Sequence, residues 1–549
     1  MAMGASRHKQ SAAASAALSP FRHRVFRLLW IATVISNIGG WMYSAAAGWL
    51  MATLNPDPLM VSLVQAASNL PMFLLALPAG ALADIIDKRR FVLLLEVSIT
   101  IVSILFASLI SAQLMIPVTL LLFVFLSSSL SALEAPAWQS IVPQLVPKED
   151  LAAAIAANSV GINISRALGP ALAGVIIVAF GIAAPFWIDA FSNLGVIAVL
   201  FWWRPRVHQK RTLPAEKFKS AIRAGLRYAR YNMHLRATLL RSIGFFLFAS
   251  AYWALLPLVA RSQLQGGPEL YGVLLAGIGA GAVVLALILP RLKSRFGVSG
   301  LVVSGEAGTA LALALFGVAR GPLTAVLASV IAGASWITVL ANLNVSAQVA
   351  LPEWVRGRGL AMYVMVFFGA MSIGSVVWGA LAGVIGLQFT HFIAAAGALV
   401  AIPLTRRWKL QTGAQIDLTP SMHWPDPIVT GSVEEDAGPV MVSIEYMIEP
   451  KDREPFLKEI HKLAQERKRD GAYAWGIFED TSNRRRFVET FLVESWVEHL
   501  RQHRRVTNAD RVLQEHLHRY LSEKPRVTHL IAAEAGRGIP RSVPNQGAT

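Results

Sequence analysis

Long apolar segments separated by short polar connections run through the first three quarters of the chain. A helix needs about 20 mostly apolar residues to cross a bilayer core about 30 Å thick. Segments of about that length occur in two sets of six, near residues 25–53, 58–83, 91–112, 117–137, 151–180 and 183–203, and near residues 240–260, 270–291, 299–319, 322–346, 358–385 and 388–405. The pattern predicts an all-α membrane protein with twelve transmembrane helices in two six-helix bundles.

The composition also indicates that much of the chain faces lipid. Of the 549 residues, 54% are hydrophobic and 15% are charged, whereas soluble domains contain about 25% charged residues. Cysteine is absent, which excludes disulfides and thiolate metal ligands. The formal net charge of +17 fits either nucleic-acid binding or the cytoplasmic loops of a membrane protein.

The positions of the cations decide between these two interpretations. Lys and Arg gather in alternate connections between the predicted helices, at Lys88, Arg89 and Arg90, at Lys148, at ten positions from Arg204 to Arg236, at Arg291, Lys293 and Arg295, and at Arg356 and Arg358. The intervening connections carry only Arg261 and Arg320. Because cytoplasmic loops are enriched in Lys and Arg, we expect both termini in the cytoplasm and no nucleic-acid partner. Residues 1–20 lack a signal-peptide core and are predicted to form a cytoplasmic tail.

The two sets of helices show traces of an internal duplication. The hexapeptide ALAGVI occurs at 171–176 and again at 380–385, and the same offset aligns Pro143 with Pro352. We therefore predict an N-terminal bundle over 21–205, a basic cytoplasmic linker over 206–236 and a C-terminal bundle over 237–409. Transporters use such repeats to build a central site that opens alternately to the two sides of the membrane.

The connection between the second and third predicted helices has the sequence GALADIIDKRR at residues 80–90. In this topology it resembles the loop signature of the major facilitator superfamily, and the resemblance extends over about residues 20–409. The signature positions are filled by Gly80, Leu82, Asp84, Lys88, Arg89 and Arg90, while Asp87 replaces a usual glycine. The resemblance implies a conformational latch in which Asp84 stabilises the outward-facing state and Glu134, at the end of the fourth helix, takes part.

The fifth predicted helix contains SRALGPALAG at residues 165–174. Gly169, Pro170 and Gly174 match the core of a motif that is associated with the drug/proton antiporters of this superfamily. Ser165 stands where a glycine is usual, and Arg166 follows it. Small residues allow helices to pack closely, so a packing seam without a transport role is the alternative for this antiporter-like motif.

Two further stretches, FRHRVFRLLWIATVISNIGGWM and EAPAWQSIVPQLVPKEDLAAA, resemble the branch that contains the enterobactin exporter. This resemblance implies efflux of a small metabolite, siderophore or drug across the bacterial inner (plasma) membrane, with proton antiport as the coupling. The sequence contains no Walker-type phosphate-binding loop, which argues against direct coupling to ATP. An importer is the alternative in direction, and the sequence does not identify the substrate.

Ionisable groups within membrane helices are costly, so each one is a candidate functional residue. Arg166 lies near the middle of the fifth helix and requires a carboxylate, polar lining or water, with Asp189 and Glu134 as candidate partners. Asp189 is a candidate for proton coupling, together with Arg166, and a structural ion pair between them is the alternative.

Glu96 and Glu306 occupy similar depths in the third and ninth predicted helices, near the cytoplasmic side. The simplest interpretation of both is ion pairing with nearby loop cations such as Lys88 or Arg295.

Polar and aromatic side chains near the middle of several helices are candidates for the substrate cavity. They are Asn37, Trp41, Asn158 and Asn163 in the first half and Tyr252, Trp253, Trp336, Asn342 and Asn344 in the second half. Hydrogen bonding between helices or an interfacial aromatic anchor is an alternative for each of them.

The composition changes after residue 409. Residues 410–437 are predicted to be a linker, 438–535 a soluble ferredoxin-like α+β domain with the order βαββαβ, and 536–549 a flexible tail. The sequence FLVESWVEHLRQH resembles dimeric α/β-barrel domains related to antibiotic-biosynthesis monooxygenases. The resemblance implies dimerisation through this domain, with cytoplasmic regulation or substrate delivery as its role and chemical modification of the cargo as the alternative.

His499 and His503 are spaced to share one helical face, where they could hold a metal ion. No third ligand is evident nearby in the sequence. Exposed histidines on a basic helix are the commoner case, so we expect no metal. No set of residues in this domain compels catalysis, because such folds often serve as binding or dimerisation modules. We therefore expect no cofactor and no catalytic residues, and a transporter rather than an enzyme. The expected partners are a small-molecule substrate, protons and the lipid bilayer.

Overall fold

The computed structural model describes residues 18–203, 218–411, 417–421, 424, 427, 429, 433–434 and 437–533. Most of the predicted N-terminal tail, the first part of the basic linker, parts of the 410–437 linker and the tail 536–549 lie outside the described residues. The chain divides into two compact units. The first comprises Met1–Pro214, Thr238–Asn344 and Tyr363–Leu410, and the second comprises Ala215–Ala237, Val345–Met362 and Gln411–Thr549.

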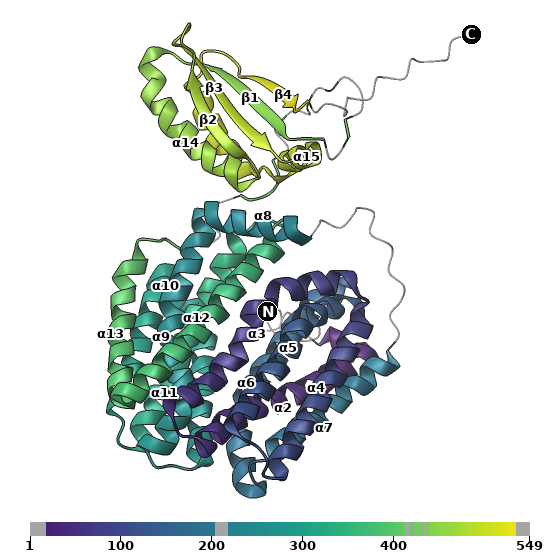
Figure 1. The fold of residues 1–549 in the computed structure, drawn as a ribbon, viewed down its shortest axis with the longest axis vertical. Coiled ribbons are helices and arrows are strands. Elements are labelled where there is room, and N and C mark those ends of the chain that lie inside the picture. The colour runs from purple at the N-terminus through teal and green to yellow at the C-terminus, as the bar shows by residue number, and fades with distance from the viewer. Residues whose placement is uncertain are drawn as a thin grey trace, which may run out of the picture. The chain divides into compact units, whose positions relative to one another are not determined.

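Eleven helices of the described chain are long and apolar enough to cross a membrane, and Figure 1 shows them in two groups. The first group is α2 (Arg24–Leu54), α3 (Pro58–Ile85), α4 (Lys88–Ser111), α5 (Pro117–Leu145), α6 (Leu151–Phe180) and α7 (Ala184–Trp202). The second group is α9 (Met233–Leu258), α10 (Pro268–Val318), α11 (Pro322–Val349), α12 (Arg356–Ile385) and α13 (Leu387–Arg406). A short 3₁₀ turn, Ser19–Arg22, precedes α2.

The longest helix, α10, contains two of the predicted membrane spans. Gly297, at its middle, has a φ of +66°, which lies outside the helical region and interrupts the helix. Only glycine adopts such a backbone conformation without strain. With α10 counted as two spans, the described chain contains the twelve spans that the hydrophobic pattern predicts, and the predicted membrane fold is confirmed.

Proline and aspartate define where several helices begin. Pro58, Pro117 and Pro268 occupy the first positions of α3, α5 and α10, where the missing N–H of proline removes no hydrogen bond. Asp57 precedes α3 and its side chain accepts a hydrogen bond from the Met60 N–H at 3.0 Å. These local signals explain why the helices begin close to the first residues of the apolar segments.

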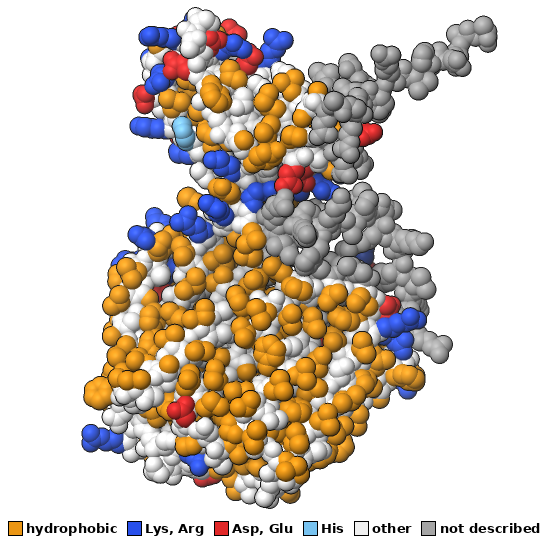
Figure 2. All heavy atoms as spheres, viewed as in Figure 1, with side chains coloured by type: hydrophobic (Ala, Val, Ile, Leu, Met, Phe, Trp, Pro, Cys, Tyr) orange, Lys and Arg blue, Asp and Glu red, His pale blue; other side chains and the backbone are white. Residues whose placement is uncertain are grey.

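The outer surface of the helical bundle is apolar. Figure 2 shows hydrophobic side chains over most of its visible face, with the visible charged side chains near its ends. Leu287, Leu323 and Val384 are each more than three quarters exposed. Such a surface is suited to contact with lipid tails rather than water.

The two groups of helices contact each other closely near the ends of α2 and α3 that carry Leu54 and Pro58. A Cβ added at Gly174 of α6 would lie 2.8 Å from the Pro268 carbonyl oxygen at the start of α10. The Trp49 ring of α2 stacks on the Tyr271 ring of α10 with centroids 5.8 Å apart. Glycine at position 174 is therefore required for this close approach, and these contacts join the two groups at this end.

The C-terminal domain has the predicted order of elements. Its strands are β1 (Val440–Met447), β2 (Tyr473–Glu479), β3 (Arg486–Val493) and β4 (Arg526–Ile531), and its helices are α14 (Arg453–Arg469), α15 (Trp496–Arg505) and α16 (Asn508–His518). The four strands form one antiparallel sheet in the order β2-β3-β1-β4. The βαββαβ order and this sheet order are those of a ferredoxin-like fold, so the predicted fold class of this domain is confirmed.

One face of this sheet packs against the helices. Val442, Ile444 and Tyr446 of β1 alternate with less buried residues and join Phe456 and Ile460 of α14 in a continuous core. The alternation has the two-residue period of a strand that is buried on one face.

The linker helix α8 (Phe218–Tyr231) packs with this domain in the second unit. The Arg469 guanidinium lies 5.7 Å from the centre of the Tyr228 ring, and the Arg227 Nε donates to the Arg469 carbonyl at 3.4 Å. Arg505 of α15 lies over the ring of Trp354, in the connection between α11 and α12, at 4.4 Å. The second unit therefore joins the C-terminal domain to two connections of the membrane helices.

Candidate functional site

A stripe of buried polar groups runs along α4. Glu96, Thr100 and Ser103 are 6%, 5% and 1% exposed, and their spacing of four and three residues places them on one helical face. The Thr100 hydroxyl donates to the Glu96 carbonyl at 2.8 Å. We call Glu96, Thr100 and Ser103 the polar stripe. Sequence reasoning missed the stripe, although the spacing of these three residues in an apolar segment was a usable signal.

Asp189 lies at one end of the polar stripe. It projects from α7 and is 5% exposed, and its Oδ2 accepts a hydrogen bond from the Ser103 hydroxyl at 2.8 Å. A Cβ at Gly39 of α2 would lie 2.9 Å from the Asp189 Cα, so α2 and α7 approach closely here. Among the described residues, this carboxylate is hydrogen-bonded by a hydroxyl and is not paired with a cation, and burying a carboxylate charge without a cation is costly.

Glu134 lies at the other end of the polar stripe. Its carboxyl group on α5 interacts directly with that of Glu96. Two facing carboxyl groups in an apolar environment cannot both carry a charge, so the pair tends to hold one proton. The predicted ion pair between Glu96 and Lys88 is replaced by this carboxyl pair.

Arg166 lies apart from these acids. Its guanidinium lies over the Trp41 ring of α2, 5.2 Å from the ring centre, and its Nε has no hydrogen-bond partner among the described residues. The candidate partners Asp189 and Glu134 do not pair with it. The structure therefore offers a partly buried cation that is held by an aromatic ring and has no carboxylate partner within the described chain.

The antiporter-like motif of α6 forms a tight seam with α2 and α10. The Ser165 hydroxyl donates to the Val34 carbonyl at 3.1 Å, and a Cβ at Gly169 would clash with the Trp41 side chain. Pro170 is buried within the helix, and Gly174 faces α10. Close helix packing therefore explains these small residues.

The residues of the latch sequence GALADIIDKRR lie at the end of α3 and the start of α4. Gly80 has open space where a Cβ would point, with no heavy atom of the described residues within 4 Å. Leu82 packs against the core of the first group of helices. Arg89 donates to the Leu200 and Phe201 carbonyls at the end of α7, both at 2.8 Å. The side chain of Asp84 lies outside the described ones.

Lys88 and Arg90 are the other cations of this turn, and both lie in the first turn of α4. Lys88 is partly exposed and Arg90 is exposed. The three cations of the latch sequence therefore lie at the beginning of a membrane helix, where they can contact polar headgroups.

The cavity candidates of the first half lie on α2 and α6, in different surroundings. Asn163 is exposed and donates to the Ser159 carbonyl of its own helix at 2.8 Å. Asn158 lines a small pocket with Trp30 and Trp138, between α2, α5 and α6. Asn37 is partly buried on α2, one turn before Trp41.

The second half contains a cluster of aromatic rings. Trp336 of α11 contacts Trp253 and Phe246 of α9, each with ring centres 5.4 Å apart, and Phe367 of α12 at 6.0 Å. Tyr252 is fully buried beside Trp253. The rings of this cluster pack against one another and join α9, α11 and α12.

The polar candidates of the second half make local contacts. Asn342 is buried and donates to the Thr338 carbonyl at 2.7 Å, while Asn344 is exposed. Glu306 pairs with Arg241 of α9 at 3.6 Å, and both side chains are at most 4% exposed. The predicted pairing of Glu306 with the loop cation Arg295 is therefore wrong, because the cation comes from within α9.

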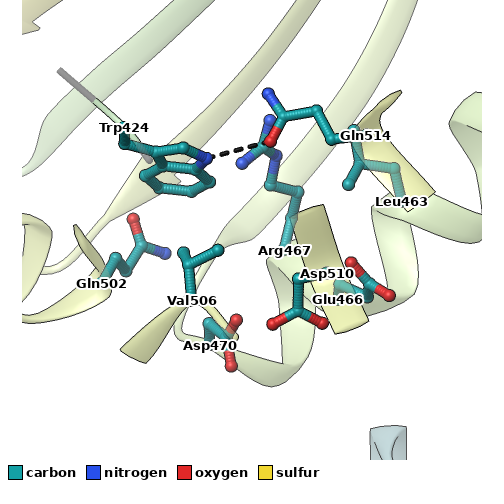
Figure 3. Close-up of a pocket in the computed structure, with 9 residues that line it drawn as sticks. All are labelled: Trp424, Leu463, Glu466, Arg467, Asp470, Gln502, Val506, Asp510 and Gln514. Atoms are coloured by element: carbon teal, nitrogen blue, oxygen red, sulfur yellow. Dashed lines mark hydrogen bonds between the residues drawn. The ribbon is translucent and has the colours of Figure 1, made fainter. Parts of the chain in front are cut away.

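The C-terminal domain has a small polar pocket, which Figure 3 shows. It is lined by Trp424, Leu463, Glu466, Arg467, Asp470, Gln502, Val506, Asp510 and Gln514. The Trp424 Nε1 donates to the Gln514 Oε1 at 3.0 Å. Burial, reinforced by Asp510, raises the pKa of the Glu466 carboxyl to about 9. The pocket therefore contains a carboxyl group that is protonated at neutral pH.

Next to this pocket, His499 and His503 lie on one face of α15 as predicted. Their Nε2 atoms are 3.3 Å apart. The structure adds His529 of β4, which the sequence did not indicate because about 25 residues separate it from the pair. Burial lowers the pKa of His499 to about 3, so its imidazole is neutral at physiological pH.

Comparison with known proteins places this geometry in context. A family model described as "transmembrane secretion effector" matches residues 15–537 of the chain. The staphyloferrin A transporter of Staphylococcus aureus is 25% identical over 367 residues, which are 65% of this chain and 89% of that protein. The enterobactin exporter of Citrobacter koseri is 24% identical over 371 residues, which are 65% of this chain and 85% of that protein.

Solved structures agree with the fold. A POT family transporter in complex with a thioalcohol-conjugated peptide superposes with a TM-score of 0.58 at 14% identity, covering 69% of this chain and 95% of that one. The nucleoside transporter NupG superposes with a TM-score of 0.52 at 13% identity, covering 70% and 98%. At such identities the likeness concerns the fold alone.

Proposed function

Because the chain belongs to the transmembrane secretion effector family of major facilitator transporters, we propose that it exports a small metabolite, siderophore or drug by alternating access coupled to proton antiport. The protein is a multi-pass transporter of the bacterial membrane and not an enzyme. Relatives named for staphyloferrin A and enterobactin favour a chelating metabolite as cargo.

The observation that carries proton coupling is the polar stripe with an acid at each end. Glu134 contacts Glu96 at one end of the stripe, and Ser103 donates to Asp189 at the other end. A proton antiporter needs carboxyl groups that can be neutral within the membrane and exchange protons when water reaches them. The stripe offers such groups at two depths of the N-terminal bundle.

The distribution of cations supports an orientation. The latch cations Lys88, Arg89 and Arg90 lie at the end of the bundle opposite to Leu54 and Pro58, and cationic ends of membrane helices face the cytoplasm. Both termini are then cytoplasmic, and the contacts of Gly174 and Trp49 with α10 close the external side. Open space at Gly80 fits a latch that is released in this inward-facing arrangement.

Arg166 is the group that we expect to recognise the cargo. Its guanidinium has no carboxylate partner among the described residues and is held over Trp41, so an acidic group of a ligand would complete its hydrogen bonds. Ala167, the next residue, lies against Gly279 of α10, which places this turn of α6 at the junction of the two halves. The aromatic cluster around Trp336 would contact the apolar part of the same molecule.

Export is tested in two steps. A deletion strain is compared with its parent for secreted siderophores and for resistance to a drug panel, which identifies a cargo. Everted membrane vesicles are then given that cargo and an imposed pH gradient. We expect accumulation by the wild type, and loss of gradient-driven accumulation but retention of cargo counterflow in Asp189→Asn and Glu96→Gln.

Asp57→Asn is the matched control, since it removes an exposed carboxylate outside the polar stripe and keeps the helix cap at α3. It should transport like the wild type. Absence of accumulation by the wild type under the gradient would count against proton-driven export. Gradient-driven accumulation that persists in both stripe variants would exclude the stripe as the coupling site.

A further inference from the structure

Three imidazole rings converge between α15 and β4 in the C-terminal domain. His499 and His503 are one turn apart on α15, and His529 is on β4. One nitrogen of each ring lies within 4.8 Å of the other two. His499 is 1% exposed, while His503 and His529 are partly exposed. The cluster is therefore buried on one side and reachable from the other.

Local structure fixes the convergence. The Ser495 side chain caps α15 by accepting a hydrogen bond from the Glu498 N–H, which sets the direction in which His499 and His503 project. In the sheet, His529 is paired with Val442, whose side chain belongs to the core under the helices. Paired residues of antiparallel strands project to the same face, so His529 points to the side of the sheet that carries α15.

The distances fit a tetrahedral metal site. Two nitrogens each about 2.0–2.1 Å from a zinc ion are about 3.3–3.4 Å apart at the tetrahedral angle. The His499 and His503 Nε2 atoms are 3.3 Å apart, and a His529 nitrogen lies within 4.8 Å of both rings' ligand atoms. We propose that His499, His503 and His529 bind one divalent transition-metal ion such as zinc.

The positive charge of a nearby arginine does not prevent a metal ion from binding to this cluster. Arg467 is close to this cluster, but it is paired with the fully buried Glu489 at 3.4 Å. The Tyr446 hydroxyl also donates to Glu489, at 2.7 Å. The positive charge of Arg467 is therefore balanced within the domain, and it opposes a metal ion only weakly.

Two tryptophans complete the site. The Trp424 ring lies 5.1 Å from His503, and the Trp496 ring lies 5.5 Å from His499 and 6.3 Å from His529. Such an apolar shell limits the access of water to a metal site. Three imidazoles leave one tetrahedral position for water or for an oxygen donor of a chelating molecule. Simple ring packing without a metal is the alternative that the experiment must exclude.

The test uses the full-length protein, purified in detergent with an affinity tag that contains no histidine and stripped with a chelator. Zinc chloride is titrated by calorimetry, and cobalt chloride is added separately to record the visible spectrum. We expect one ion per chain and a tetrahedral cobalt spectrum. His503→Gln and His529→Gln should each weaken zinc binding by about tenfold or more.

His516→Gln is the matched control, because His516 is exposed on α16 in the same domain and lies outside the cluster. It should bind zinc like the wild type, and thermal unfolding of all variants separates loss of ligand from loss of fold. Zinc binding that is absent in the wild type, or that survives both His503→Gln and His529→Gln, would overturn the proposal.

Discussion

Asp87 accepts, through its Oδ1, a hydrogen bond from the backbone N–H of Arg90 at 2.9 Å. It is the N-cap of α4, which begins at the next residue. An N-cap aspartate satisfies a backbone donor that the helix cannot pair, and its charge is favoured by the helix dipole. The aspartate that departs from the superfamily's glycine pattern therefore has a structural role at this turn.

Replacing Asp87 should destabilise the start of α4. We expect Asp87→Ala to lower the free energy of unfolding by about 1 kcal/mol, because the cap is lost. Asp87→Asn should retain stability, since asparagine caps equally well without the charge. Thermal unfolding in detergent measures both, and equal stability of Asp87→Ala and wild type would contradict the capping role.

The latch residue Asp84 should control the balance between the two states of the transporter. If Asp84 stabilises the outward-facing state, Asp84→Asn should populate the inward-facing arrangement, slow transport and leave membrane insertion intact. Because the chain contains no cysteine, a single Ser62→Cys reports this balance. Ser62 is 0% exposed on α3, where the two halves meet.

In the Ser62→Cys background, Asp84→Asn should reduce labelling by a membrane-impermeant maleimide added from outside. A cysteine at the exposed Ser44 of α2 provides the reference for general reactivity. Unchanged labelling together with unchanged export would remove Asp84 from the switching mechanism.

The buried pair of Arg241 and Glu306 should be costly to break from one side. Their charged atoms are 3.6 Å apart, and the Glu306 Oε2 and two nitrogens of Arg241 have no hydrogen-bond partner among the described residues. Removing one charge leaves the other buried and unpaired, at a cost of about 3–5 kcal/mol. We expect Glu306→Leu to lower the unfolding temperature strongly, and the double variant Arg241→Met/Glu306→Leu to restore most of it. Equal losses in the single and double variants would show that the charges do not stabilise each other.

The sequence predicts the helices well because lipid imposes a length on each apolar segment. The helices α3, α5 and α6 begin at Pro58, Pro117 and Leu151, which are the predicted first residues of these spans. Gly297, which interrupts α10, also lies in the predicted connection between two spans. The βαββαβ domain follows from strand alternation and from a helix that ends near Gly471, which has a positive φ.

The partners of the buried charges were harder to predict. Arg166 was expected to need a carboxylate, polar lining or water, and instead its guanidinium lies over the Trp41 ring. Glu306 pairs with Arg241 from a different helix, and His529 joins His499 only through the pairing of β4 with β1. Such contacts depend on helix rotation and strand register, which a single sequence specifies only through the whole fold.

The stability of the C-terminal domain should depend on pH through Glu466. Burial raises the pKa of its carboxyl to about 9, whereas an unfolded glutamate has a pKa of about 4.3. The folded domain therefore holds a proton that the unfolded chain releases between these values, and the free energy of unfolding falls as the pH rises through this window. Glu466→Gln should weaken this decline and stabilise the domain at pH 8.

Hydrogen exchange of the β1 and β3 amides in the full-length protein, corrected for intrinsic exchange rates, measures this stability. Glu454→Gln on the same helix is the control, because Glu454 is exposed and its ion pair is with its neighbour Arg453. The same pH dependence in wild type and Glu466→Gln would assign the effect to another group.

The face of the C-terminal sheet opposite the helices should mediate dimerisation. Met441 of β1 is flanked on this face by Leu492 and by Leu530, which is 47% exposed, and Phe478 of β2 is 59% exposed. A second copy would cover these apolar side chains, as the resemblance to dimeric α/β barrels implies.

We expect Leu530→Glu to convert a dimer into a monomer, as measured by light scattering of the full-length protein in detergent. Val512→Glu is the matched control, because Val512 is 51% exposed on α16, away from this face. A monomeric wild type, or dimers that both variants retain, would contradict this interface.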